Sequence, residues 1–182
     1  MSDRKMFRLF FAWQDEAEER WLEGMRAKGF ELIDVSFPGI YRFREAEARK
    51  VSYRLDYFPD KDRDEEYRAI FGDAGWRSVC AYNGWQYFTH PEAGREIYTD
   101  CPSKAAKYRR VLRLLTAVLP SQIMGLLVVS RAVRDGDIRP GLSVALAVLF
   151  VLVVASFIMV AVSFFKIWRR ASELEAGRPT GA

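Results

Sequence analysis

The sequence has 182 residues, enough for one compact domain and a further segment, and carries a formal net charge of +4. This charge is unevenly divided, since residues 1–100 hold 16 Lys/Arg against 20 Asp/Glu, whereas residues 101–182 hold 12 against 4. Because the basic excess flanks the apolar runs of the second part, it indicates membrane topology and argues against a nucleic-acid-binding surface.

Cysteine and histidine are scarce, with only Cys80, Cys101 and His90 in the chain. Their spacing matches no metal motif, so the sequence predicts no metal site, no cofactor and no disulfide framework. This usage fits a reducing, cytoplasmic setting. The N-terminal residues lead directly into a short expected strand, so we expect no signal peptide.

Residues 5–44 alternate between strand-like and helix-like patterns. An aromatic and aliphatic run predicts a strand over 5–13, and Trp21, Leu22 and Met25 form the apolar stripe of a helix over 14–28. Alternating residues predict strands over 30–37 and 40–44. The first turns of the helix are acidic, which suits the helix dipole: Asp15, Glu16, Glu18 and Glu19.

Residues 51–89 repeat this order. We predict a strand over 51–58, an acidic helix entrance over Asp60–Glu66, and strands over 76–82 and 85–89 joined by the hairpin signal Asn83-Gly84. A shift of 46 residues, without a gap, places Phe7 on Tyr53, Trp21 on Tyr67 and Gly29 on Gly75.

These patterns predict an α+β fold built from a duplicated strand-helix-strand-strand unit, with repeats at about 5–45 and 51–90, inside a cytoplasmic domain over 1–100. Units of this size bury too little apolar surface alone, so we expect one antiparallel sheet with two helices on one face, followed by a two-helix transmembrane hairpin. Strict alternation puts six side chains of the first strands under the helices: Phe7, Leu9, Phe11, Tyr53, Leu55 and Tyr57.

The opposite, helix-free sheet face is the candidate ligand site. Arg8, Arg54 and Asp56 would be its polar anchors, and its walls would be Trp76, Trp85 and Tyr87. The alternative is an ordinary solvated sheet face, on which charged residues need no functional explanation. No nucleophile–base pair and no Gly-rich phosphate loop is visible, so we predict no catalytic residues and no enzyme.

The remaining residues predict a membrane anchor. A basic juxtamembrane linker or helix over 101–113 precedes transmembrane helix 1 over 114–130, and transmembrane helix 2 covers 141–165. The alternatives are buried helices of a soluble protein or, for 114–130 with its Pro120, a half-inserted segment. Lys/Arg residues at both outer ends favour cytoplasmic termini, and over 166–182 we expect a short cytoplasmic tail, disordered from Ala171 onward.

Several strings together carry a family resemblance. They are Phe7-Arg8-Leu9-Phe10-Phe11, Glu19-Arg20-Trp21-Leu22, Ala27-Lys28-Gly29-Phe30, Tyr41-Arg42-Phe43, Tyr53-Arg54-Leu55-Asp56-Tyr57, Asp73-Ala74-Gly75-Trp76, Gly84-Trp85-Gln86-Tyr87-Phe88 and Glu96-Ile97-Tyr98-Thr99-Asp100. In this order they resemble a bacterial family of domains of unknown function, number 2812, over about residues 5–110. The resemblance implies apolar spans after the domain and a regulatory setting, since members are often encoded beside PadR-type repressors. It supplies no catalytic residues.

Two functions follow as hypotheses. The first is a membrane-anchored sensor or regulator in a multi-pass cell-membrane position, whose cytoplasmic domain binds a small amphipathic or cationic ligand, or a membrane or regulatory protein partner. The second is a structural or interaction subunit of a membrane complex. A looser topological analogy links the repeat to small-molecule-binding domains of the GyrI-like group.

Overall fold

A computed structural model of the chain describes residues 3–59, 64–98, 101–134 and 140–177. The chain forms two compact units, Met1–Lys107 and Tyr108–Ala182, which are described separately. The start of the predicted acidic helix entrance at residues 60–63, residues 135–139 between the two predicted transmembrane helices, and the last five residues of the predicted tail lie outside the described residues.

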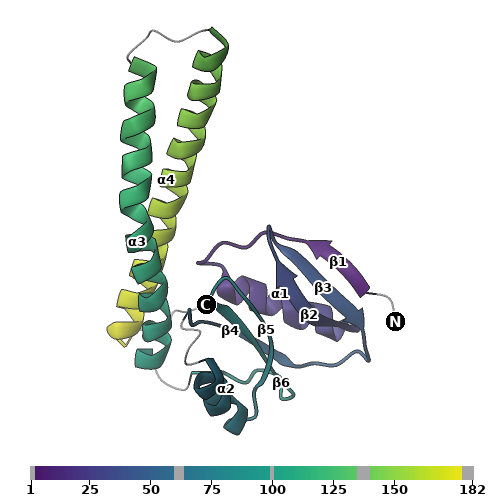
Figure 1. Cartoon of the computed structure of the whole chain (residues 1–182). Coiled ribbons are helices and arrows are strands. Elements are labelled where there is room, and N and C mark those ends of the chain that lie inside the picture. Colours follow the sequence, from purple (N-terminus) through teal and green to yellow (C-terminus); the bar gives the residue numbers. More distant parts are fainter. Residues whose placement is uncertain (1–2, 60–63, 99–100, 135–139, 178–182) are drawn as a thin grey trace. The chain divides into compact units, whose positions relative to one another are not determined.

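The first unit contains six strands and two helices before the chain enters the first of two long helices (Figure 1). In order they are β1 (Asp3–Phe7), α1 (Asp15–Ala27), β2 (Phe30–Ser36), β3 (Ile40–Glu45), β4 (Ser52–Tyr57), α2 (Asp64–Asp73), β5 (Arg77–Tyr82), β6 (Trp85–His90), α3 (Cys101–Arg134) and α4 (Pro140–Glu175). The α+β class is therefore confirmed, and each half of the domain has the order strand, helix, strand, strand.

The strands form two antiparallel sheets, ordered β1-β3-β2 and β4-β6-β5, so the expectation of one continuous sheet is wrong. Strands β2 and β5 are neighbours in space, but the ladders run only within each sheet. Irregularities interrupt both strands, between Leu32 and Asp34 and between Ser78 and Cys80. Because such a bulge bends a strand and breaks its pairing register, the two facing edges do not join into one ladder.

An apolar core lies between α1 and residues of both sheets. Its buried members come from α1, β2, β3, β4, β6 and the residue before β4: Leu22, Met25, Leu32, Val35, Tyr41, Phe43, Val51, Tyr53, Leu55 and Tyr87. Full burial of side chains of this size stabilises the fold by roughly 1.5–3 kcal/mol each. The predicted burial of Tyr53, Leu55 and Tyr57 is confirmed, since each is at most 3% exposed.

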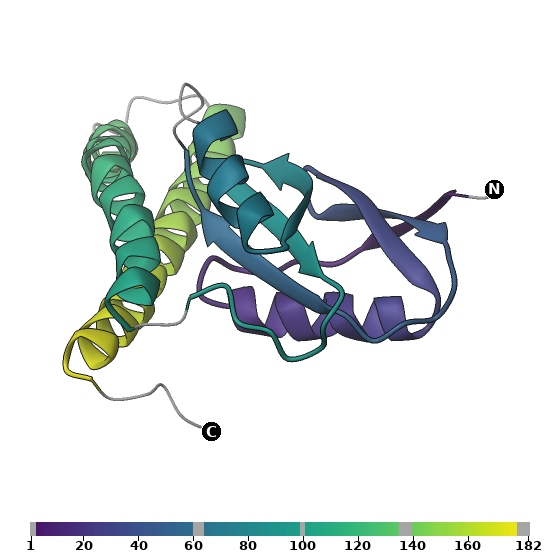
Figure 2. The same cartoon turned by 90° about the horizontal axis from the view of Figure 1, so that it is seen from below.

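Helix α2 covers the other face of the second sheet (Figure 2). The rings of Tyr67 and Phe71 lie 6.0 and 4.9 Å from the ring of Phe88, and Tyr67 stacks on Phe58 at 4.1 Å. The apolar core beside α1 lies on the opposite face of this sheet. The expectation of two helices on one sheet face is therefore wrong, because β4 and β6 carry apolar side chains on both faces and each face acquires its own cover.

Strand β1 is shorter than predicted, and different side chains of this stretch face the core. It ends at Phe7, and the expected core residues Phe7, Leu9 and Phe11 are 65%, 57% and 43% exposed. Met6 and Phe10 pack against the core instead. Alternation could not decide between these two sets, because the stretch from Met6 to Phe11 has apolar residues at both parities.

The predicted hairpin turn agrees with the structure. Asn83 and Gly84 have φ values of 49° and 83°, as the two-residue hairpin between β5 and β6 requires. Gly29, with φ of 85°, follows the C-terminal end of α1. A left-handed residue at this position ends a helix with little strain when it is glycine.

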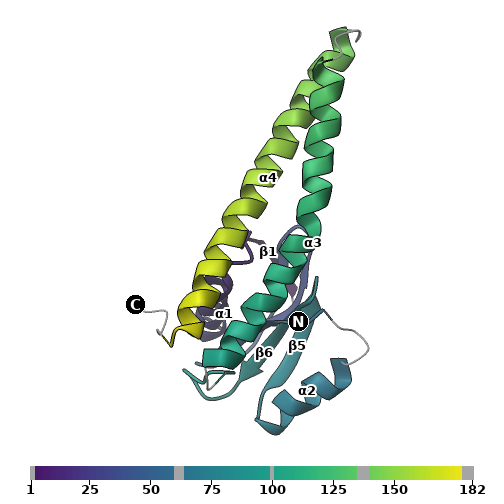
Figure 3. The same cartoon turned by 90° about the vertical axis from the view of Figure 1, so that its left-hand side faces the viewer.

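The second unit consists of most of α3 together with α4. The two helices lie side by side and antiparallel, with Arg109 of α3 bound to Glu175 of α4 and Gly125 close to Val153 (Figure 3). By length and composition, both are apolar enough to cross a membrane. Pro120 lies inside α3, and α4 continues to Glu175, so the expectation of a disordered tail from Ala171 is wrong for its first five residues.

Candidate functional site at the edge of strand β4

Strand β4 is an edge strand whose outer side is covered by side chains instead of another strand. It pairs with β6 on one side only. On the other side, the backbone N–H groups of Tyr53 and Leu55 donate to the carboxylates of Glu23 and Glu19 at 3.1 and 2.8 Å. The Leu55 carbonyl accepts from Lys107 Nζ at 3.0 Å. These bonds satisfy backbone groups that an edge otherwise leaves open.

The acidic side chains come from one face of α1. Asp15, Glu19 and Glu23 are spaced by four residues, which places them above one another along the helix. Asp15 forms an ion pair of 2.6 Å with Lys107, and the two side chains are 1% and 3% exposed. Removing one member of such a buried pair leaves an uncompensated charge, so the two residues depend on each other.

Glu19 titrates in an unusual range. Burial raises the pKa of its carboxyl group from 4.5 to about 7, with a smaller contribution in the same direction from Asp15, while Lys107 and the bond from Leu55 oppose the rise. Its side chain therefore changes charge near neutral pH, at the point where α1 contacts β4.

A second buried carboxylate joins the two sheets. The hydroxyl groups of Tyr41, in β3, and Tyr87, in β6, donate to Glu18 Oε1 at 2.7 and 2.8 Å. Burial raises the pKa of Glu18, although both tyrosine bonds act against the rise. One residue of α1 is thus bonded to both halves of the domain.

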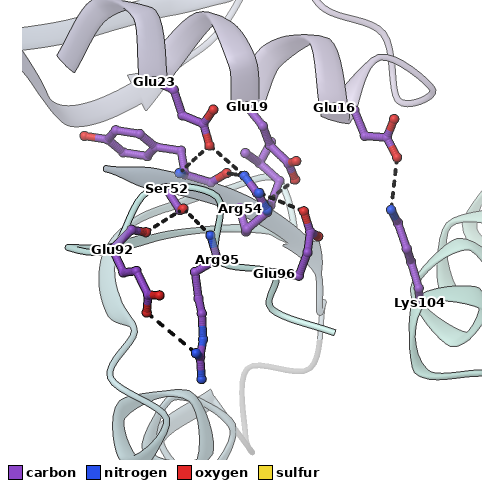
Figure 4. Close-up of polar contacts among 11 residues, drawn as sticks. Glu16, Glu19, Glu23, Ser52, Arg54, Glu92, Arg95, Glu96 and Lys104 are labelled. Atoms are coloured by element: carbon purple, nitrogen blue, oxygen red, sulfur yellow. Dashed lines mark hydrogen bonds and ion pairs between the residues drawn. The ribbon is translucent and has the colours of Figure 1, made fainter. Parts of the chain in front are cut away.

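Arg54 is the centre of the ion-pair cluster on β4 (Figure 4). One terminal nitrogen donates to Glu23 and to the Tyr53 carbonyl, each at 2.7 Å, and the other donates to Glu96 at 2.8 Å. Its side chain is only 11% exposed. Its Nε atom is buried, with no hydrogen-bond partner among the residues that the structure describes.

The connector between β6 and α3, residues 91–98, is fastened to the same strand. Ser52 Oγ, fully buried, donates to the Glu92 carbonyl and accepts from the Arg95 N–H group, both at 2.8 Å (Figure 4). With the Arg54–Glu96 pair, this gives the connector three bonds to β4. Its position therefore depends on the state of that strand.

The first seven residues of α3 belong to the domain as well. Lys104 forms an ion pair of 3.1 Å with Glu16, and Lys107 binds Asp15 and the Leu55 carbonyl (Figure 4 shows the first of these). Two of the five basic residues that we assigned to a juxtamembrane linker therefore hold the start of α3 against α1 and β4. We use the name β4 edge site for Asp15, Glu19, Glu23, Arg54, Glu96 and Lys107.

The structure does not bring the six predicted site residues together into one cleft. Arg54 and Asp56 lie on β4, whereas Arg8 follows β1 in the first half, where it is exposed and lies 5.1 Å from the rings of Phe10 and Trp21. Ligand binding by these residues stays a prediction.

Asp56 was expected on an open face, and this is wrong because its side chain is completely buried. It accepts from the Tyr57 N–H group at 2.8 Å and from the hydroxyl group of Tyr67 in α2. Helix α2 covers the face that we expected to be free of helices.

The three expected aromatic walls are separate. Trp76 is 5% exposed and lies 5.1 Å from the ring of His90, while Trp85 lies 5.4 Å from Tyr57. Tyr87 is part of the core and binds Glu18. Their aromatic surface is used in packing within the domain.

A small cavity lies elsewhere, where β2 and β5 meet. Its volume is about 190 Å³, and its lining comes from both strands and Arg44: Glu31, Leu32, Ile33, Arg44, Arg77, Ser78 and Val79. Glu31 pairs with Arg44 and Arg77 at 2.7 and 2.5 Å, so one carboxylate is shared by two guanidinium groups at this cavity. Within the described ranges, no group of three His, Cys, Asp or Glu residues is arranged to hold a metal ion.

Sequence reasoning missed most of the β4 edge site. The helix dipole alone explained why the start of α1 is acidic. The apolar run that follows Lys107 alone explained why a basic residue is found there. The spacing of Asp15, Glu19 and Glu23 was the available signal, because three carboxylates on one helix face beside Leu22 and Met25 point toward the core.

Comparison with known proteins places the chain in a family. The model of the family described as "Protein of unknown function (DUF2812)" matches residues 14–119. The chain belongs to this family. The matched range includes α1, both sheets apart from β1, and the start of α3, so all residues of the β4 edge site fall within it. No curated protein and no solved structure matches the chain.

Proposed function

We propose that this DUF2812 protein is a membrane-anchored sensory or regulatory protein whose ligand- or partner-binding domain lies in the cytoplasm. One observation carries the proposal. Lys107, in the second turn of α3, is buried in the domain and bound to Asp15 and to β4, and the same helix continues without interruption to Arg134. This contact supports a role in which a change at the β4 edge site alters the start of α3, the helix that we propose enters the membrane.

The membrane position is supported by length and charge. Helices of 34 and 36 residues are about 50 Å long, which exceeds the roughly 30 Å hydrocarbon core of a bilayer. The uncharged residues 114–130 and 141–165 would occupy this core. Eight Lys/Arg residues lie at the outer ends, within 104–113 and 166–170, against three between the apolar runs, within 131–139, and this difference favours cytoplasmic termini.

An internal repeat supports a domain of two similar halves. Each half has its strands in the order first, third, second, and the interruptions of β2 and β5 occur at Ile33 and Val79, 46 residues apart. We propose that the halves descend from one duplicated unit. After such a duplication, helix α1 of the first half contacts the second half as well.

A cationic ligand fits the charge of the β4 edge site. Glu96 is 56% and Glu23 29% exposed, and both are bound to Arg54. An amphipathic cation could replace the Arg54 guanidinium at these two carboxylates and release the connector over 91–98. This gives a ligand a direct route to the start of α3, because the connector precedes it in the chain.

The test uses the full chain in nanodiscs, a panel of amphipathic amines and quaternary ammonium compounds, and two measurements. Binding is followed by the thermal midpoint, and the connector by amide hydrogen exchange. The proposal predicts a compound that shifts the midpoint and also changes exchange at 91–98, with both effects lost in Glu96→Gln and kept in the control Glu92→Gln. If no compound changes exchange in the connector, the ligand version of the proposal is wrong.

A structural or interaction subunit is the second candidate. It is favoured by exposed apolar side chains at one end of the first sheet, where Phe7, Leu9 and Phe37 are 65%, 57% and 80% exposed. An exposed aliphatic and aromatic surface of this kind marks many protein contacts. Purification from mild detergent at native expression separates the two candidates: a stoichiometric partner lost in Phe7→Ser/Phe37→Ser favours the subunit, and a partner-free chain argues against it.

A further inference from the structure

The second unit contains a groove between its two helices. It has a volume of about 530 Å³ and is lined by five residues of α3 and one of α4: Arg109, Leu112, Arg113, Thr116, Ala117 and Phe164. Along α3, the two arginines lie at one end and the uncharged residues continue toward the other. The groove is therefore cationic at one end and apolar along the rest of its length.

Contacts on the basic side of the groove keep the helices together. Arg109 binds Glu175 at 2.7 Å, and the guanidinium of Arg170 lies 5.5 Å from the ring of Tyr108. Tyr108 and Ile167 are completely buried. The arginine end of the groove therefore lies next to a region where α3 and α4 are packed together.

Beyond the arginines, the lining of the groove is mostly apolar. Ala117 fills little space, and the Thr116 hydroxyl donates to the Leu112 carbonyl at 2.9 Å within α3. This bond satisfies the hydroxyl group locally. What remains for a ligand is methyl and methylene surface, with the ring of Phe164 opposite.

The charge at the arginine end of the groove is positive. Arg109 is neutralised by Glu175, whereas Arg113 is exposed and has no ion-pair partner among the residues that the structure describes. Helix α3 contains no Asp or Glu, and α4 has only Glu173 and Glu175. An anion at this end of the groove would meet Arg113 without competition from a neighbouring carboxylate of the same helix.

We propose that the groove binds an anionic phospholipid, with its phosphate at Arg113 and one acyl chain along Leu112, Thr116, Ala117 and Phe164. The inference rests on the proposed membrane position. A guanidinium pairs well with a phosphate, and basic pockets between membrane helices bind anionic headgroups. The apolar part of the groove requires a chain attached to that headgroup, so free phosphate does not meet the requirement.

The test equilibrates the full chain with vesicles of equal phosphatidylglycerol and phosphatidylcholine, followed by mild detergent extraction and native mass spectrometry. Wild-type protein should retain phosphatidylglycerol about fivefold over phosphatidylcholine, since one basic contact is worth on the order of this ratio. Arg113→Gln should remove the preference, and Thr116→Trp and Ala117→Leu, which fill the groove, should reduce retention of both lipids. Arg131→Gln, an exposed arginine near the other end of α3, serves as the matched control.

Two results overturn the proposal in different ways. Equal retention of both lipids by wild type, or an unchanged preference in Arg113→Gln, contradicts the lipid site while the membrane position stands. Complete release of the wild-type chain from the vesicles by alkaline carbonate contradicts the membrane position itself, and the lipid site with it.

Discussion

The raised pKa of Glu19 predicts that the domain becomes less stable as the pH rises through neutrality. Burial raises this pKa from 4.5 to about 7 in the folded chain. Between these values the folded state binds more protons than the unfolded state, so the free energy of unfolding falls with increasing pH. The stabilisation is complete below pH 4.5 and is lost as the pH passes 7.

The size of the effect follows from the shift. A rise from 4.5 to about 7 corresponds to about 3 kcal/mol between pH 4.5 and pH 8. Glu18 contributes in the same direction because its pKa is also raised. Glu31 affects stability in the opposite direction and at lower pH. Its pKa is lowered from 4.5 in the folded chain, so its contribution to the free energy of unfolding is present above pH 4.5 and is lost as the pH falls below that value.

The assay is urea unfolding of the full chain in mild detergent, followed by tryptophan fluorescence at pH 5.5 and pH 8. Glu19→Gln keeps an acceptor for the Leu55 N–H group and removes the titration, so its pH dependence should be smaller by about 2 kcal/mol over this interval. Glu16→Gln is the matched control, because Glu16 lies on the same helix in a partly exposed pair. The reasoning is refuted if Glu19→Gln and wild type show the same pH dependence, or if wild type becomes more stable toward pH 8.

Other predictions concern the buried ion pair, a turn, a helix position and a thiol. Lys107→Met should cost about 3–5 kcal/mol in urea unfolding, and Asp15→Asn in the same chain should recover more than half of it, since it removes the uncompensated charge; equal losses in single and double variants would contradict this. Gly39→Ala should destabilise by more than about 2 kcal/mol, because its Cβ atom would lie 2.5 Å from the Arg8 carbonyl oxygen at a φ of +122°. Gly24→Ala should stabilise by about 0.5–1 kcal/mol, because this position inside α1 has nothing within 4 Å of the added Cβ atom. Burial raises the pKa of Cys80 to about 12, so iodoacetamide should modify it at pH 8 only after unfolding; rapid modification of the native chain would show that the thiol is accessible.

Local patterns were sufficient for most of the elements. The predicted strands at 30–37, 40–44, 51–58, 76–82 and 85–89 differ from β2 to β6 by one residue at most at either end, and the helix over 14–28 differs from α1 by one. These segments carry alternation or helical periodicity bounded by Gly, Pro or Asn, and such signals depend only on neighbouring residues.

The association of the elements could not be obtained in the same way. Strand β4 is buried on both faces, so its alternation could not tell which face receives α1 and which receives α2. The prediction of an open face at Arg54 and Asp56 assumed that charged side chains point to water. In the structure these two charges are satisfied by Glu23, Glu96 and Tyr67, which are distant in sequence.

The sequence also did not show where the domain ends and the membrane anchor begins, because the basic residues at this point could be explained by the apolar run that follows them. Lys104 and Lys107 precede an apolar run, where basic residues are expected in any membrane protein. Their partners Glu16 and Asp15 lie 88 and 92 residues earlier in the sequence. Only the three-dimensional contact shows that these lysines hold the start of α3 inside the domain.

Amide hydrogen exchange of peptides covering residues 101–107, in the full chain in nanodiscs, shows whether the domain holds the start of α3. We expect these residues to be protected in wild type. Asp15→Asn should accelerate their exchange about tenfold or more while β2 and β3 are unaffected, as loss of one strong buried contact requires. The control Glu16→Gln, which removes only the partly exposed pair with Lys104, should have a much smaller effect. Exchange at 101–107 that is already fast in wild type, or that does not respond to Asp15→Asn, would contradict the claim that the domain holds the start of α3.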